Sequence, residues 1–73
     1  MTEQRVICTT IATETGAEIG LIRLNKPAAL NAIDLSMVRR IDAQLLEWQS
    51  NDDIVTIVLD GVGDKAFCAG GDV

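Results

Sequence analysis

Hydrophobic positions along the first third of the chain follow a short period that is typical of β-strands. Residues 6–13, VICTTIAT, and residues 18–24, EIGLIRL, are rich in β-branched and aliphatic types, and the ETGA between them is typical of a turn. We expect a β-hairpin with Gly16 in its turn. The next stretch, NKPAALNAI, breaks the pattern because Pro27 lacks a backbone donor, so a loop is predicted over residues 25–33.

From Asp34 onward, apolar residues recur at steps of three and four, and polar residues fall between them. This spacing predicts an amphipathic helix with Asp34 as its N-cap, ending in the polar SNDD of residues 50–53. The apolar face of the helix is expected to consist of Met37, Val38, Ile41, Leu45 and Trp48.

A continuous apolar run, IVTIVLDG, follows the helix and is bounded by glycine. A run of this kind after a helix indicates a strand buried on both faces of a parallel sheet. The predicted class is therefore α/β, in the order hairpin, loop, amphipathic helix, buried strand, loop. We expect residues 1–73 to be one piece of a single larger domain, ending just past the carboxyl edge of a strand, where α/β ligand sites usually lie.

Composition supports a small aliphatic core. The 73 residues are 48% hydrophobic but include only one Trp, one Phe and no Tyr. A chain of this length buries only about 60% of the surface of its unfolded form, so we expect marginal stability on its own. The net charge of −5 and the scattered positions of the six Lys and Arg residues argue against nucleic-acid binding.

The cysteine and histidine content limits the predicted cellular compartment and the catalytic mechanisms available to the chain. Cys8 and Cys68 are far apart and show no CxxC spacing, which favours reduced thiols over a disulfide framework. The N-terminus has no long apolar segment and no stretch approaches 18 apolar residues, so we expect a cytoplasmic protein without a signal peptide or membrane span. The absence of His from this sequence excludes Ser-His and Cys-His nucleophile pairs and His-containing zinc sites within it.

The last nine residues, KAFCAGGDV, concentrate several kinds of reactive residue. Cys68 could be a nucleophile, but only Lys65 is near enough in sequence to lower its thiol pKa, and a small packing cysteine is favoured. No metal site is predicted, because Asp60, Asp64 and Asp72 lack the alternation and terminal Glu of an EF-hand loop and fit turns and caps better.

The stretch GVGDKA at residues 61–66 formally matches the dinucleotide fingerprint G-x-G-x-x-A directly after a strand. That fingerprint needs a helix to begin inside the motif, so that its N-terminus holds the pyrophosphate. The following FCAGGDV is a poor helix start, and an ordinary turn is favoured over a dinucleotide-binding domain.

Adjacent glycines at positions 70 and 71 allow the backbone to approach a ligand closely. If a helix begins at Asp72, the N–H groups there point outward at the positive end of its dipole. Main chain of this kind can form an oxyanion hole without histidine. A tight turn and an oxyanion hole both remain open from the residues alone.

Two separated stretches resemble the crotonase (enoyl-CoA hydratase/isomerase) superfamily. LNKPAALNAI at residues 24–33 is similar to the L-N-R-P-x-A-L-N-A loop of that family, and KAFCAGGDV at residues 65–73 is similar to its A-F-x-A-G-x-D segment. Both occur in the family's order, with an amphipathic helix and an apolar strand between them. The resemblance implies the N-terminal part of a ββα spiral that binds coenzyme A thioesters.

The resemblance also implies roles for individual residues. The residue after A-G, here Gly71, would donate its N–H to the thioester oxygen in the oxyanion hole. Ala28 stands where relatives often carry a lysine, and Lys26 would compensate for that missing charge. No separate cofactor is expected, since coenzyme A is part of the substrate. The implied substrate-binding residues are Lys26, Ala28, Ala29, Leu30, Ala69, Gly70, Gly71, Asp72 and Val73.

Within the superfamily, CAGGDV together with Met37, Ile41 and Trp48 looks most like the 3-hydroxyisobutyryl-CoA hydrolase branch of valine degradation. An enoyl-CoA hydratase/isomerase of fatty-acid oxidation is the alternative, and a truncated, non-catalytic coenzyme A-binding or assembly piece is a third possibility. The family's second oxyanion donor and catalytic carboxylates lie further downstream, so these 73 residues alone are expected to be inactive. A homo-oligomer, or completion by a further chain segment, is expected.

Overall fold

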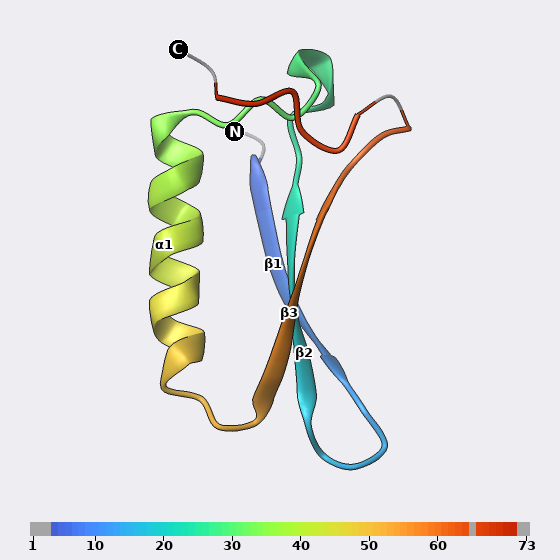
Figure 1. Cartoon of the computed structure of the whole chain (residues 1–73), viewed down its shortest axis with the longest axis vertical. Coiled ribbons are helices and arrows are strands. Elements are labelled where there is room, and N and C mark those ends of the chain that lie inside the picture. Colours follow the sequence, from blue (N-terminus) through green and yellow to red (C-terminus); the bar gives the residue numbers. More distant parts are fainter. Residues whose placement is uncertain (1–3, 65, 72–73) are drawn as a thin grey trace.

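One mixed sheet and one α-helix make up most of residues 4–64 and 66–71, which the computed structural model describes (Figure 1). The sheet order is β1-β2-β3, with β1 and β2 antiparallel and β2 and β3 parallel. The elements in chain order are β1 (Val6–Ala12), β2 (Glu18–Leu24), the short 3₁₀ helix η1 (Pro27–Ala29), α1 (Leu35–Gln49) and β3 (Ile54–Gly61).

The predicted hairpin is confirmed. Val6 lies opposite Leu24 at one end of the β1–β2 ladder, and Ala12 lies opposite Glu18 at the other. Gly16 has a φ of 89° in the turn, a backbone conformation that favours glycine. The Thr13 hydroxyl donates to the Ala17 carbonyl at 2.6 Å and closes the turn.

The predicted helix and its N-cap are also confirmed. The Asp34 carboxylate accepts hydrogen bonds from the Met37 N–H at 2.9 Å and from the Ser36 hydroxyl at 2.7 Å. These bonds hold the pKa of Asp34 well below its usual range, since they stabilise the charged form. No helix in the part of the chain that the structure describes is long and apolar enough to cross a membrane.

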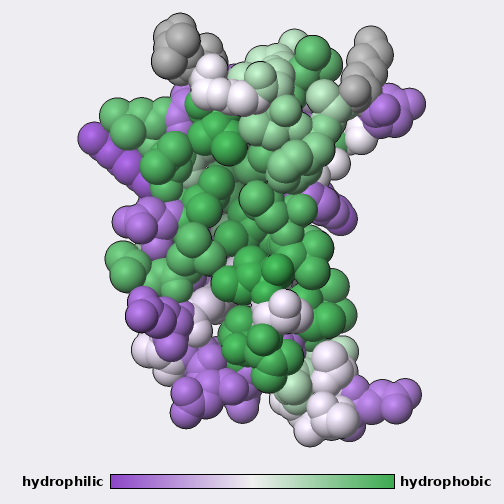
Figure 2. All heavy atoms as spheres, in the orientation of Figure 1, coloured by the Kyte–Doolittle hydropathy of each residue, from purple (hydrophilic) through white to green (hydrophobic). Residues whose placement is uncertain are grey.

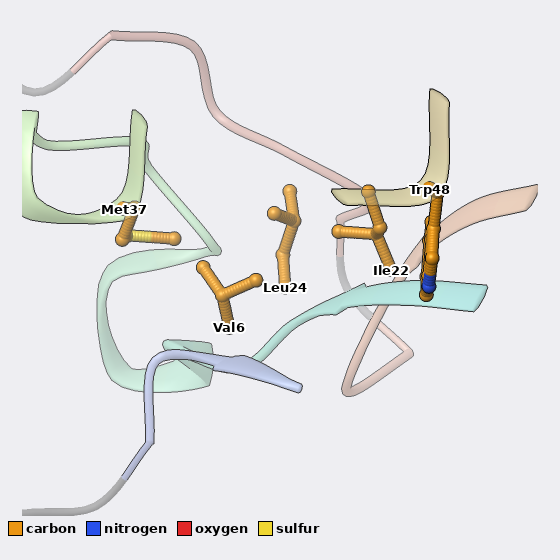
Figure 3. Packing of buried hydrophobic residues seen from close by; sticks show 5 residues of the cluster. All are labelled: Val6, Ile22, Leu24, Met37 and Trp48. Atoms are coloured by element: carbon orange, nitrogen blue, oxygen red, sulfur yellow. The ribbon is translucent and has the colours of Figure 1, made fainter. Parts of the chain in front are cut away.

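The core lies between α1 and the sheet face formed by alternate residues of β1 and β2 (Figure 3). Because side chains alternate between faces along a strand, the register brings Val6, Ile22 and Leu24 to the same side. Met37 and Trp48, from opposite ends of α1, cover them. Ile33, Ile41 and Cys68 are partly buried against this cluster.

The helix face differs in part from the expected one. Gln44 is buried, with 7% of its surface exposed, whereas Leu45 is 39% exposed and Val38 also faces solvent. The polar end of Gln44 is satisfied, because its Oε1 accepts from Arg40 at 3.0 Å and its Nε2 donates to Glu47 at 2.7 Å. The aliphatic stem of Gln44 can therefore pack inward at little cost.

The expectation that the IVTIVLDG strand is buried on both faces is wrong for the residues described. β3 lies at the edge of the sheet beside β2, and every residue from Val55 to Leu59 is exposed. α1 packs against β1 and leaves the helix-side face of β3 uncovered. Figure 2 shows a continuous apolar surface over the middle of the view, in the region that β3 crosses in Figure 1.

Candidate functional site

The loop after β2 folds back on itself just before α1. Leu30 and Asn31 have φ values of 52° and 58°, so two consecutive residues adopt the left-handed conformation. The Leu30 N–H donates to the Pro27 carbonyl at 3.0 Å, and the Asn31 N–H donates to the Lys26 carbonyl at 2.9 Å. The predicted 25–33 loop is thus an ordered turn built around η1.

The segment after β3 runs alongside this loop (Figure 1). The Ala69 N–H donates to the Leu30 carbonyl at 2.9 Å, and the Ile33 N–H donates to the Gly70 carbonyl at 2.8 Å. An isolated parallel bridge joins Ile33 to Gly71. The described parts of the two stretches that resemble the crotonase motifs, far apart in the sequence, therefore lie side by side.

Gly71 presents its main chain to open space. It is exposed, and within residues 4–64 and 66–71 its N–H has no acceptor. A Cβ added at Gly70 or Gly71 would meet nothing within 4 Å, but Gly70 has a φ of 105° and needs glycine for that reason. The main chain at this point is accessible to a ligand oxygen. Asp72 and Val73, the other two residues predicted here, lie outside the described residues.

Two hollows flank the loop, and the predicted loop residues line them. The smaller, of about 340 Å³, lies between the loop and the turn after β3, and Ala28 and Leu30 line it. The larger, of about 930 Å³, lies between the start of β1, the loop and the first turn of α1, and Lys26, Ala28 and Ala29 line it.

Positive charge gathers in the larger hollow although the chain as a whole is acidic. Arg5, Lys26 and Arg40 line it. Arg5 Nη1 lies 2.7 Å and Lys26 Nζ lies 3.3 Å from the same carboxylate oxygen of Asp34. Arg5 and Lys26 share this carboxylate, and three cations gathered around one hollow can attract an anionic group.

The geometry around Cys68 favours packing over nucleophilic chemistry. Cys68 is partly buried against the core, and its sulfur accepts a hydrogen bond from the Gly70 N–H at 3.3 Å. Lys65, the cation that lies near Cys68 in sequence, is outside the described residues. The other thiol, Cys8, is free as well, and burial raises its pKa.

The structure bears on the dinucleotide fingerprint and on Asp60, one of the aspartates weighed as metal ligands. Residues 62–64 and 66–71 contain no helix, which the dinucleotide fingerprint requires at this point. Asp60 forms an ion pair with Arg23 through two hydrogen bonds of 2.9 and 2.8 Å, and these bonds lower the pKa of Asp60. Its role is to join β2 to β3.

Sequence reasoning missed Asn31. Its side chain is completely buried and bonds to main chain on both sides of the site. The signal available in the sequence is weak, because Asn in a loop indicates only tolerance of the left-handed conformation. Its partners lie 31 and 35 positions later, where local patterns carry no information about them.

Comparisons with known proteins identify the family. Residues 19–73 match the family model described as enoyl-CoA hydratase/isomerase, and the chain belongs to that family. An enoyl-CoA hydratase from Rhodobacter sphaeroides has the same fold over 94% of this chain, with a TM-score of 0.81 and 40% identity. The fold is accordingly the N-terminal part of the crotonase fold, and the predicted α/β class is confirmed.

Two curated relatives carry names of different kinds. The mitochondrial 3-hydroxyisobutyryl-CoA hydrolase of Rattus norvegicus is 50% identical over 54 residues, which cover 74% of this chain. The small ribosomal subunit protein mS47 of Neurospora crassa is 54% identical over 52 residues, which cover 71% of it. The chain spans 14% and 10% of the length of these two relatives, and 19% of the Rhodobacter structure.

Proposed function

We propose that this chain provides the coenzyme A-facing part of an acyl-CoA thioester-processing enzyme, with the Gly71 N–H as one donor of the oxyanion hole. The observation that carries the proposal is the accessible main chain of Gly71, held beside the 25–33 loop by its bridge to Ile33. As water or a base attacks the substrate, negative charge develops on the thioester oxygen. A preorganised N–H stabilises that charge, and loss of one such donor typically slows an enzyme about 10²–10³-fold.

The remaining predicted residues bind the rest of the substrate in this proposal. Ala69, Gly70, Asp72 and Val73 hold the pantetheine and adenine portions with Ala28, Ala29 and Leu30 of the loop. The cationic hollow supports a place for the phosphates, where Lys26 acts together with Arg5 and Arg40. These two arginines supply charge that Ala28 does not.

The specific reaction we propose is hydrolysis of 3-hydroxyisobutyryl-CoA. The 50% identity to the rat hydrolase supports it. The Rhodobacter enoyl-CoA hydratase, at 40% identity, supports the alternative, a hydratase or isomerase. We propose that the reaction needs no separate cofactor, that the protein works in the cytoplasm, and that it acts as a homo-oligomer or with a further chain segment.

A second candidate function is a non-catalytic assembly piece. The 54% identity to a ribosomal subunit protein favours it, because a closely similar sequence occurs in a protein named for its place in an assembly. The two candidates differ in one respect that can be measured. Only the enzyme needs the Gly71 N–H to polarise a thioester carbonyl.

Semisynthesis can remove that N–H; the one other change is that the Gly70 carbonyl becomes an ester carbonyl, a weaker acceptor for the Ile33 N–H. Cys68 allows residues 1–67 to be ligated to a synthetic peptide of residues 68–73, in which glycolate replaces Gly71 and an ester oxygen replaces its N–H. Carbonyl-labelled isobutyryl-CoA is then bound at saturation, and the infrared stretch of its thioester carbonyl is recorded. The ligated chain with Gly71 intact is the control.

We expect the intact chain to lower the carbonyl stretching frequency, since a hydrogen bond polarises the carbonyl, and the ester chain to lose that shift. A Gly71→Ala chain keeps the N–H and should keep the shift. Failure of the intact chain to bind the thioester would favour the assembly candidate. Equal shifts in the intact and ester chains would remove Gly71 from the proposed mechanism.

A further inference from the structure

We infer that Asn31 is the positioning residue of this site, fixing the main chain of residues 66–71 relative to the sheet. The inference rests on the proposed function for its meaning, since the segment that Asn31 holds ends in the proposed donor Gly71. Whether Asn31 holds residues 66–71 in position can be tested separately from the proposed function.

The Asn31 side chain has no exposed surface and uses both ends of its amide. Its Oδ1 accepts from the Lys26 N–H at 2.8 Å. Its Nδ2 donates to the Val62 carbonyl at 2.9 Å and to the Ala66 carbonyl at 3.3 Å. A single buried side chain thus joins the loop after β2 to both sides of the turn after β3.

The backbone at Asn31 suits this role. Its φ of 58° lies in the left-handed region, which Asn adopts more readily than most residues. The same turn directs the Leu30 carbonyl to the Ala69 N–H. The side chain and main chain of this turn therefore hold the 66–71 segment at successive points.

Gly61 provides the space for the Asn31 amide. A Cβ at Gly61 would lie 2.7 Å from Asn31 Nδ2 and 2.5 Å from the Phe67 carbonyl oxygen, closer than carbon atoms approach such groups. The next residue, Val62, donates its N–H to the Leu24 carbonyl at 2.8 Å. Val62, whose carbonyl accepts from Asn31, is therefore held at the end of β2. Because Asn31 also donates to the Ala66 carbonyl, it fixes Ala66 relative to Val62.

Main-chain bonds complete the path from Asn31 to the donor. The Gly70 carbonyl accepts from Ile33, two residues beyond Asn31, and Gly71 bridges to Ile33. Hydrogen bonds from the segment 30–33 thus fix residues 66–71 from one end to the other. In this arrangement the side chain of Asn31 ties the start of the segment to the end of the sheet, through the Ala66 and Val62 carbonyls.

The Asn31→Asp variant tests this role with almost no change in size. Its carboxylate can still accept from Lys26 but cannot donate to the Val62 and Ala66 carbonyls, and it places oxygen against oxygen. Asn25→Asp is the matched control, because Asn25 also donates its amide to a main-chain carbonyl, that of Gln4 at 2.8 Å, but away from the 66–71 segment.

Amide hydrogen exchange in the full 73-residue chain, followed by NMR without ligand, is the first measurement. In Asn31→Asp we expect protection of the Ala69 and Ile33 amides to fall by about tenfold or more, since buried donors and acceptors lose their partners. Amides of the β1–β2 ladder should keep their protection, and Asn25→Asp should behave as wild type at Ala69 and Ile33. Unchanged protection of those two amides in Asn31→Asp would overturn the inference.

The infrared shift of saturating isobutyryl-CoA is the second measurement, and it reports donor position independently of affinity. Asn31→Asp should lose the shift at pH 8 and regain part of it at pH 5, because burial of the new carboxyl raises its pKa above the ordinary value of about 3.9 and the protonated form can donate again. A shift retained at pH 8 would overturn the positioning role. If wild type shows no shift, the proposed function fails, and the exchange result still decides whether Asn31 holds the segment.

Gly61→Ala disturbs the same amide, together with the Phe67 carbonyl of the held segment, and covers the case in which Asn31→Asp does not fold. We expect it to reproduce the loss of protection at Ala69 and Ile33. A folded Gly61→Ala chain with wild-type protection at both amides would contradict the inference.

Discussion

The ring of Trp48 lies directly over Gly20. A Cβ added at Gly20 would be 2.6 Å from Cζ3 of the ring, a distance that real Cβ atoms do not reach. Gly20 is in the middle of β2, and Trp48 is in the last turn of α1. The absence of a side chain at one strand position therefore sets how closely the end of the helix approaches the sheet.

Gly20→Ala should destabilise the fold by about 1–3 kcal/mol, the usual cost of overpacking a core. The added methyl has no room unless the indole ring or the whole helix end moves. Urea denaturation followed by circular dichroism measures the change. Trp48→Phe in the same background should recover part of the loss, since the smaller ring leaves space for the methyl. Purely additive effects of the two substitutions would show that they do not meet.

Stability should fall in acid because of Asp34. Its folded-state pKa is lowered, so the stability it contributes is present above its unfolded pKa of about 3.9 and is lost as the pH falls toward the folded value. Asp60 shifts in the same direction through Arg23 and adds to the effect. We expect the free energy of unfolding to decline steadily below about pH 4, measured by denaturation between pH 2 and pH 7.

Asp34→Asn separates this charge from the helix cap, because the Asn amide oxygen can still accept from the Met37 N–H. The variant should be less stable than wild type at pH 7, and the difference should shrink below about pH 4. Asp42→Asn, on the exposed side of α1, is the control for removing one carboxylate. A constant difference between Asp34→Asn and wild type across this range would contradict the assignment.

The edge of β3 should make the chain self-associate at high concentration. An edge strand with exposed apolar residues presents unpaired main-chain groups that another copy can pair with. Val58→Lys places a charge on that edge and should lower concentration-dependent light scattering. Val38→Lys is the matched control, since Val38 is 49% exposed on α1 and Val58 is 45% exposed on β3. Equal reductions by both variants would assign the effect to charge alone.

Local patterns were sufficient to predict the hairpin and the helix. Gly16 and the β-branched residues around it specify the turn and strands, and Asp34 with its three- and four-residue spacing specifies the start of α1. Each of these features is determined by residues close together in sequence, which is why the sequence alone predicts them.

Burial was predicted less well, because it depends on what covers a residue. The apolar run of β3 indicates that its faces avoid water, but the described residues leave both faces exposed. Gln44 is buried because Arg40 and Glu47 satisfy its amide, a three-residue arrangement that apolar periodicity does not detect. The pattern identified an amphipathic helix but placed its buried face partly on the wrong residues.

In the candidate site, too, some features were predicted from the sequence and others depend on the folded structure. Resemblance to two family motifs indicated Gly70 and Gly71, and the structure brings them beside Leu30 and Ile33. Asn31, which holds the two stretches together, was not predicted because its role exists only after the chain has folded. A buried side chain that bonds to several distant main-chain groups can be identified only from the three-dimensional contacts.

Because of the bridge between Ile33 and Gly71, the position of the Gly71 main chain also depends on the folding of elements far from it. All of α1 and β3 lies within the loop that this bridge closes, and closing a long loop costs more chain entropy than closing a hairpin turn. The site therefore depends on the helix having docked and β3 having paired. Substitutions far from Gly71, such as those at the Gly20–Trp48 contact, should therefore change the fraction of molecules in which the Ile33–Gly71 bridge is formed.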